Sequence, residues 1–223
     1  MNELKNKLER KHQDYRRLFY ETVEEISVLI ESVKPAGVNG YISDIYEKGS
    51  AGFAWQSSVK SLLENKLNKE TATITREIRQ LRTLYDCAGC GVCCRFAVSE
   101  FSFQELQIRA KNGDKTAQEF VETFVPYNTL DDARQVFPEY VELLENNTDG
   151  SFYIYHCPKV TEDNRCPDYE NRPEICRDFP DNPAAFLPVC CGYSGWKSQT
   201  EYLMLKMSVL TQIINFYLKS MRG

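Results

Sequence analysis

The chain has 223 residues, a formal charge of −5 and a sequence pI near 5.3. It contains no run of about 18 apolar residues, so the sequence predicts no membrane-spanning helix. Binding to nucleic acid needs a basic surface, whereas residues 145–185 carry nine acidic and four basic side chains. We therefore expect neither a membrane nor a nucleic-acid partner.

The N-terminus is charged and lacks the apolar core of a signal peptide, which predicts a cytoplasmic protein. Residues 3–33 then predict one long helix, because Phe19, Val23, Ile26 and Ile30 recur at three- and four-residue steps. A linker runs to about residue 50. A second helix is predicted to carry Val59, Leu63, Ile74, Ile78 and Tyr85 on one face and to lead into Cys87.

The middle of the chain predicts short helices. Ser102 and Glu105 form a capping-box pattern, flanked by Phe101 and Leu106 at the spacing of a hydrophobic staple. Asp114 is expected to cap a second short helix that reaches Val125. A further helix is expected over 131–145, restarting at Pro138, and residues 152–155 are the one clear strand.

A third long helix is predicted after a capping box at Ser198 and Glu201, with Leu203, Leu210 and Ile214 on its apolar face.

The expected fold class is mainly α. Two N-terminal helices and the C-terminal helix form a bundle beside an irregular, cysteine-rich metal-binding lobe with little strand. The expected units are a helical hairpin over 1–85, the lobe over 86–195, and a C-terminal helix over 196–223 that packs on the hairpin. Alternatively, a helix of a protein partner completes the seam between the long helices. The sequence does not fix the oligomeric state.

Nine cysteines dominate the lobe. In a reducing compartment such clusters indicate metal ligands or redox groups, not disulfides. Gly89 and Gly91 allow the backbone to curl and direct N–H groups at sulfur. Since Cys93 and Cys94 are neighbours, we expect them to serve two sites side by side, and nine thiols allow two four-coordinate sites with one left over. The candidate ligands are Cys87, Cys90, Cys93, Cys94, Cys157, Cys166, Cys176, Cys190 and Cys191.

The nearly all-sulfur donor set favours zinc or an iron–sulfur cluster, because the chain has only two histidines. Three cysteines within seven residues, with a remote Cys-Pro, are typical of ferredoxins, so we expect a cluster of the 4Fe–4S type, with zinc as the alternative. His156 is expected to be a hydrogen-bonded loop residue and not a ligand. A Cys157–His156 nucleophile is not expected, since a metal-bound thiolate cannot attack.

The motif Cys87-x-x-Cys90-x-x-Cys93-Cys94, with Cys157-Pro158 and the segment Cys166 to Pro180, resembles the YkgJ-like family of cysteine-cluster proteins. That family is described as zinc- or iron-chelating and includes the flagellin lysine N-methylase. The resemblance covers residues 85–192. It implies metal binding through Cys87, Cys90, Cys93, Cys94, Cys157, Cys166, Cys176 and either Cys190 or Cys191.

Arg172 and Arg177 flank Cys176 and are candidate cofactor-binding residues, because a guanidinium can donate to cluster sulfurs or to an acidic substrate group. We favour the alternative that both pair with nearby carboxylates and hold the loop together.

Three functions remain open from the sequence. The first is a metal-dependent protein modifier of the lysine N-methylase type, although no glycine-rich turn for a methyl donor is present. The second is a structural zinc module whose helices bind a protein partner. The third is electron transfer, and whether the protein is an enzyme stays undecided.

Overall fold

The computed structural model describes residues 2–147, 152–183, 185, 187–188 and 190–221. The chain divides into two compact units. The first, here called the helical unit, comprises 1–84 and 196–223, and the second, the cysteine unit, comprises 85–195. The predicted mainly helical class is confirmed, with one small sheet among the described residues.

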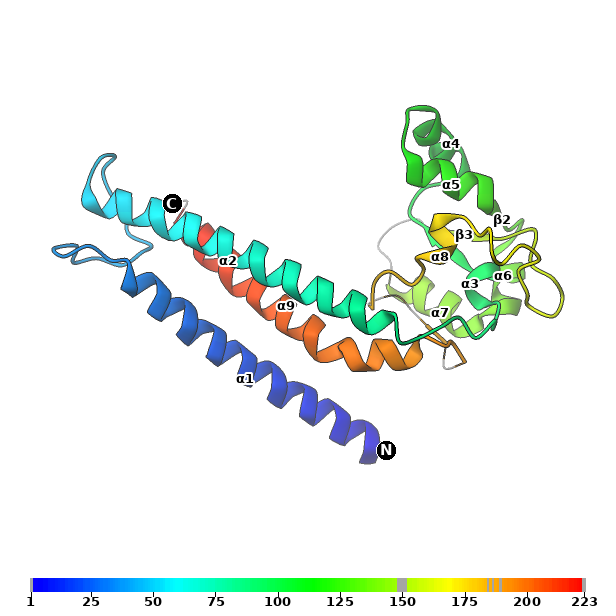
Figure 1. Ribbon diagram of the computed structural model, residues 1–223, viewed down its shortest axis with the longest axis horizontal. Coiled ribbons are helices and arrows are strands. Elements are labelled where there is room, and N and C mark those ends of the chain that lie inside the picture. Colours follow the sequence, from blue (N-terminus) through cyan, green and yellow to red (C-terminus); the bar gives the residue numbers. More distant parts are fainter. Residues whose placement is uncertain (1, 148–151, 184, 186, 189, 222–223) are drawn as a thin grey trace. The chain divides into compact units, whose positions relative to one another are not determined.

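Three long helices build the helical unit: α1 (Asn2–Ser32), α2 (Ala51–Arg82) and α9 (Ser194–Ser220). They lie side by side (Figure 1) and share one core, which hides the apolar stripes that none of them could bury alone. Ile26 and Ile30 are buried as expected, whereas Phe19 stays 37% exposed and Leu18 enters the core instead. The buried residues of this core are Leu18, Ile26, Ile30, Trp55, Val59, Leu63, Val209, Leu210, Ile213, Ile214 and Leu218.

The predicted starting point of the third long helix is wrong. The helix α9 begins at Ser194, so Ser198 lies inside it and caps nothing. The reason is tertiary: the Trp196 indole is completely buried, and its Nε1 donates to the Ile78 carbonyl over 2.9 Å. Burying an indole stabilises the extra turn by more than a capping hydroxyl could. Tyr85 is a second correction, because α2 already ends at Arg82.

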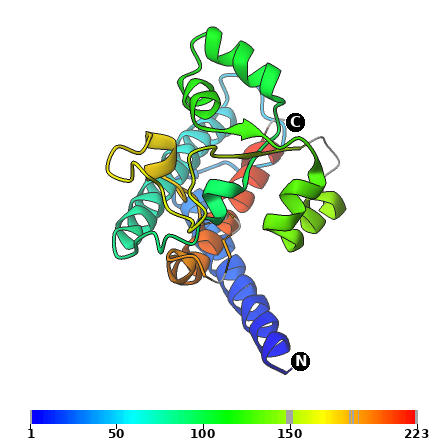
Figure 2. The ribbon, with the colours of Figure 1, turned by 90° about the vertical axis from the view of Figure 1, so that its right-hand side faces the viewer.

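The cysteine unit contains six short helices and three strands among its described residues. The helices are α3 (Val92–Arg95), α4 (Phe103–Lys111), α5 (Lys115–Thr123), α6 (Leu130–Val136), α7 (Pro138–Asn147) and α8 (Glu174–Arg177). The strands are β1 (Ala97–Ser99), β2 (Val125–Pro126) and β3 (Tyr153–His156), which form an antiparallel sheet in the order β1-β3-β2. Figure 2 shows the strands between the α4–α5 pair and the α6–α7 pair.

The central strand β3 joins two small cores. Neighbouring residues of a strand point to opposite faces, and here Ile154 packs with Ala133 and Val141 while Tyr155 packs with Leu106 and Phe124. The Tyr155 hydroxyl donates to the Phe101 carbonyl over 2.7 Å. This double anchoring holds the end of β3 in place, and Cys157 follows directly after it.

The predicted caps of α4 and α5 are confirmed. Ser102 and Glu105 form a capping box, and Asp114 accepts a hydrogen bond from the Ala117 amide over 3.1 Å. The extension of the second of these helices to Val125 is wrong, because Val125 pairs with His156 in the sheet. Strands β1 and β2 are too short for an alternating pattern and were not expected. None of the described helices combines the length and apolar character that crossing a bilayer requires.

Candidate metal centre

A cavity of about 610 Å³ in the cysteine unit brings the thiols together. All nine cysteines are free, and eight of them line this cavity: Cys87, Cys90, Cys93, Cys94, Cys157, Cys166, Cys176 and Cys191. The ninth, Cys190, is exposed and is not part of the wall. Of the two candidates for the last position, therefore, Cys191 faces the cavity.

The first four cysteines are placed by a glycine-rich turn and one short helix. Gly89 and Gly91 adopt φ angles of +67° and +71°, a left-handed conformation that glycine adopts without strain. The Gly89 amide lies 3.4 Å from Cys87 Sγ, and the amide two residues after Cys90 also donates to its thiol. The predicted N–H groups directed at sulfur are thus present.

Three separate contacts bring the remote cysteines to the same place. The Cys157 amide donates to the Cys94 carbonyl over 2.7 Å, which ties the end of β3 to α3. Cys176 lies in α8, which Glu119 of α5 holds through a 3.0 Å hydrogen bond from the Ile175 amide. The amide of Tyr193 donates to the Cys191 thiol.

The thiols act on one another in two sets. Cys176 lies within electrostatic range of Cys94, Cys157 and Cys166. Cys191 lies within range of Cys87, Cys90 and Cys190, and Cys93 lies within range of Cys87 and Cys90 as well as of its neighbour Cys94. We call Cys94, Cys157, Cys166 and Cys176 the distal set, and Cys87, Cys90, Cys93 and Cys191 the proximal set.

Burial raises the pKa values of Cys176, Cys90 and Cys191. It raises the pKa of Cys176 to about 11, with the nearby thiols of the distal set as the next cause. Burial is also the main reason why the pKa values of Cys90 and Cys191 are raised. Several negative sulfurs cannot coexist here without a cation, and a bound metal would supply it.

Cys93 and Cys94 connect the two sets. The Cys93 thiol donates a hydrogen bond to Cys94, which is the main cause that lowers the pKa of Cys94 to about 7 and raises that of Cys93. The positive charges of Arg172 and Arg95 lower the pKa of Cys94 further. One proton is therefore shared between neighbouring sulfurs that belong to different sets.

Arg172 and Arg177 occupy different surroundings. Arg172 lines the cavity, with its guanidinium carbon 3.6 Å from the centroid of the Tyr169 ring. Within the described part of the chain Arg172 makes no ion pair with a carboxylate, so the pairing favoured from the sequence is not observed for it. Arg177 donates to the Arg172 carbonyl over 3.0 Å and does not line the cavity.

Arg95 is a residue that sequence reasoning missed. Its guanidinium donates to the Asn164 side chain over 2.8 Å and to the Thr161 carbonyl over 2.9 Å. These bonds anchor the 161–165 turn beside Cys94, and adjacency to Cys94 is the only sequence signal that could have singled it out. His156 stands on β3 rather than in a loop, where its ring lies 4.5 Å from that of Tyr127, outside the cavity wall.

The rest of the cavity wall is mainly apolar, with Phe96, Phe120, Phe124, Phe137 and Tyr140 among its residues. Such a wall lowers the local dielectric and strengthens interactions between charges. Among the described residues, no three His, Cys, Asp or Glu side chains form a ready-made ion site. The donors are therefore spread around the cavity wall, and their chemistry fits a soft metal.

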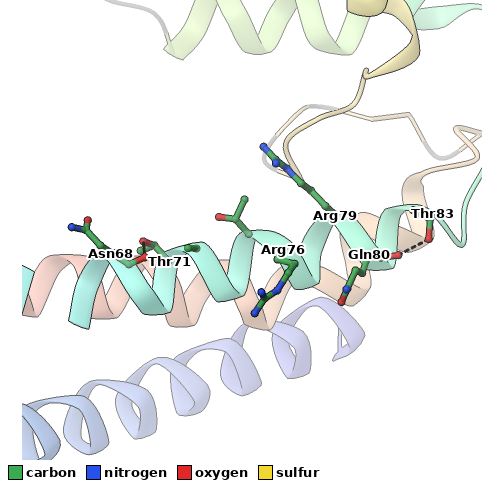
Figure 3. Close-up of a pocket in the computed structure, with 8 residues that line it drawn as sticks. Asn68, Thr71, Arg76, Arg79, Gln80 and Thr83 are labelled. Atoms are coloured by element: carbon green, nitrogen blue, oxygen red, sulfur yellow. Dashed lines mark hydrogen bonds between the residues drawn. The ribbon is translucent and has the colours of Figure 1, made fainter. Parts of the chain in front are cut away.

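A second hollow lies on the helical unit and contains no cysteine. Figure 3 shows the polar side chains that line it, which come from α2 and from Thr83, the residue that caps its C-terminal end. The lining residues are Asn68, Thr71, Ala72, Thr75, Arg76, Arg79, Gln80 and Thr83. Two arginines without a carboxylate among these eight residues make this stretch of α2 locally basic.

Comparison with protein families gives one match. Residues 86–200 match the CxxCxxCC family, whose description is "Putative zinc- or iron-chelating domain". Neither the curated proteins nor the solved structures include a match to the chain.

Proposed function

Because the chain belongs to this CxxCxxCC family of zinc- or iron-chelating domains, we propose that its cysteine unit holds an iron–sulfur centre. One observation carries the proposal: eight thiols line a single cavity and divide into two sets of four. The distal and proximal sets would supply the thiolates. When bound, such a centre supplies a one-electron donor or acceptor.

The donor set and the space around it both support this choice. The two histidines lie elsewhere, His12 in α1 and His156 outside the cavity wall, so the donors at the cavity are sulfurs. A single zinc ion with bonds of about 2.3 Å draws four sulfurs tightly together and needs no free volume. A cavity of about 610 Å³ has room for a larger inorganic group.

The surroundings favour a centre that exchanges electrons. Aromatic and aliphatic side chains line the cavity, and Arg172 and Arg95 place positive charge beside Cys94. Burial, nearby charge and N–H···S hydrogen bonds are the factors by which a protein adjusts the reduction potential of a cluster. The chain supplies all three.

Zinc is the second candidate, and a separate observation favours it. Each set holds four thiols, the number that a structural zinc ion binds, and Cys87 and Cys90 have the spacing of a zinc knuckle. In that case the metal would hold together the segment from 157 to 191, which contains one four-residue helix among its described residues. The helical unit would then carry the contacts with a protein partner.

Oxygen-free purification followed by analysis of iron, zinc and acid-labile sulfide separates the two candidates. We expect iron with sulfide and a broad absorption band near about 400 nm. Cys157→Ser should lose part of the metal, whereas the matched control Cys190→Ser should retain all of it, because Cys190 is outside the wall. Zinc without sulfide would replace the first candidate by the second. A protein with neither metal would refute both.

A further inference from the structure

We propose that Cys190 is the entry thiol of the metal centre, which accepts metal from an external thiolate donor and passes it to Cys90. This inference rests on the proposed function, because it concerns how the same site is loaded. It assigns a role to Cys190, the one cysteine that belongs to neither set of four.

The position of Cys190 differs from that of every other cysteine. It is the exposed one of the nine, while the other eight are partly buried and line the cavity. It also adjoins them, since it directly precedes the cavity-lining Cys191 in the chain and lies close enough to Cys90 to affect the pKa of that thiol. An exposed thiol therefore borders the thiols of the cavity wall.

The backbone keeps this exposed thiol in place. The Cys191 amide donates to the Pro188 carbonyl over 2.9 Å, which closes a turn around Cys190. The next residue in the chain, Gly192, lies so close to the Asp86 backbone that a side chain at this position would collide with it. The turn is thus held beside Cys87 and Cys90, with Cys190 outside and Cys191 inside.

The transfer consists of two balanced ligand exchanges. In the first, a bond between Cys190 sulfur and the metal ion forms while the bond to the donor thiolate breaks, and the Cys190 proton moves to the released donor. In the second, the Cys90 sulfur binds the ion while the bond to Cys190 breaks, and the Cys90 proton returns to Cys190. The oxidation state of the metal does not change. A bulky donor can reach an exposed thiol, whereas the partly buried ones are screened from it.

The test follows Co²⁺ uptake by the full-length metal-free protein under reducing conditions, with cobalt–glutathione as donor and the sulfur-to-cobalt absorption band as signal. Cys190→Ser should take up cobalt about tenfold more slowly and reach the wild-type end point, because access limits thiolate exchange. Cys191→Ser is the contrasting variant and should reach a lower end point. In the loaded wild-type protein, iodoacetamide should modify Cys190 ahead of all other cysteines.

Equal uptake rates for the wild-type protein and Cys190→Ser would overturn the inference. Protection of Cys190 from iodoacetamide after loading would overturn it too, because Cys190 would then be a permanent ligand. A wild-type protein that takes up no cobalt and contains no native metal would instead refute the proposed function.

Discussion

Two neighbouring substitutions, Cys93→Ser and Cys94→Ser, should weaken different halves of the metal centre. Apart from their interaction with each other, Cys93 interacts with Cys87 and Cys90, while Cys94 interacts with Cys176. Structural zinc sites contribute about 10–16 kcal/mol, and on that scale one lost thiolate of four costs about 3 kcal/mol. Since 1.4 kcal/mol corresponds to a factor of ten, the affinity of the damaged set should fall about 100-fold. The other set should keep its metal.

The assay is metal content after dialysis against a graded series of chelator concentrations. Double variants then test the division into sets, because substitutions within one site are not additive, whereas those in independent sites are. Cys94→Ser combined with Cys176→Ser should lose little more than either alone, and Cys94→Ser with Cys87→Ser should lose both portions. Loss of the same metal from the Cys93 and Cys94 variants, or loss of all metal from either, would refute the division.

Three further predictions concern stability. Leu63→Ala should lower the free energy of unfolding, measured in urea, by about 2–5 kcal/mol, because Leu63 is completely buried. The control Leu84→Ala changes a site that is 72% exposed, so its free energy of unfolding should lie within about 0.5 kcal/mol of the wild-type value. Tyr155→Phe should lower the free energy of unfolding by about 1–3 kcal/mol, since it leaves the Phe101 carbonyl unpaired. The control Tyr153→Phe, at a partly exposed site, should change the same free energy little. The metal-free protein should lose stability as the pH rises from 9 to about 11, because the pKa of Cys176 is raised in the folded state and its contribution vanishes above that value. Melting temperatures over this range should fall more steeply for the stripped protein than for the loaded one, because raised pKa values such as that of Tyr155 lower the stability of both, and equal slopes would contradict the assignment.

The helices show where local sequence suffices and where it fails. The spacing of apolar residues predicted α1, α2 and α9, because a long amphipathic helix must turn its apolar stripe toward the core. The capping residues predicted where α4 and α5 begin, because a side-chain hydrogen bond at the start of a helix depends only on residues that are close in the sequence. The prediction of where α9 begins failed, because the first turn of this helix depends on the burial of Trp196. Strands β1 and β2 were not predicted, because the strand that pairs with both of them, β3, is far away in the chain.

The sequence alone determined the chemistry of the site. Nine cysteines with almost no histidine define a soft, all-sulfur donor set, and the family motif follows from spacing that can be read in one dimension. Only the tertiary structure decided which remote cysteines join Cys93 and which join Cys94: it brings Cys176 near Cys94, turns Cys191 toward the cavity and leaves Cys190 outside the cavity wall. The physical reason is that a ligand set is defined by distances between sulfurs, and those distances depend on how β3, α8 and Cys191 pack around the 87–94 segment.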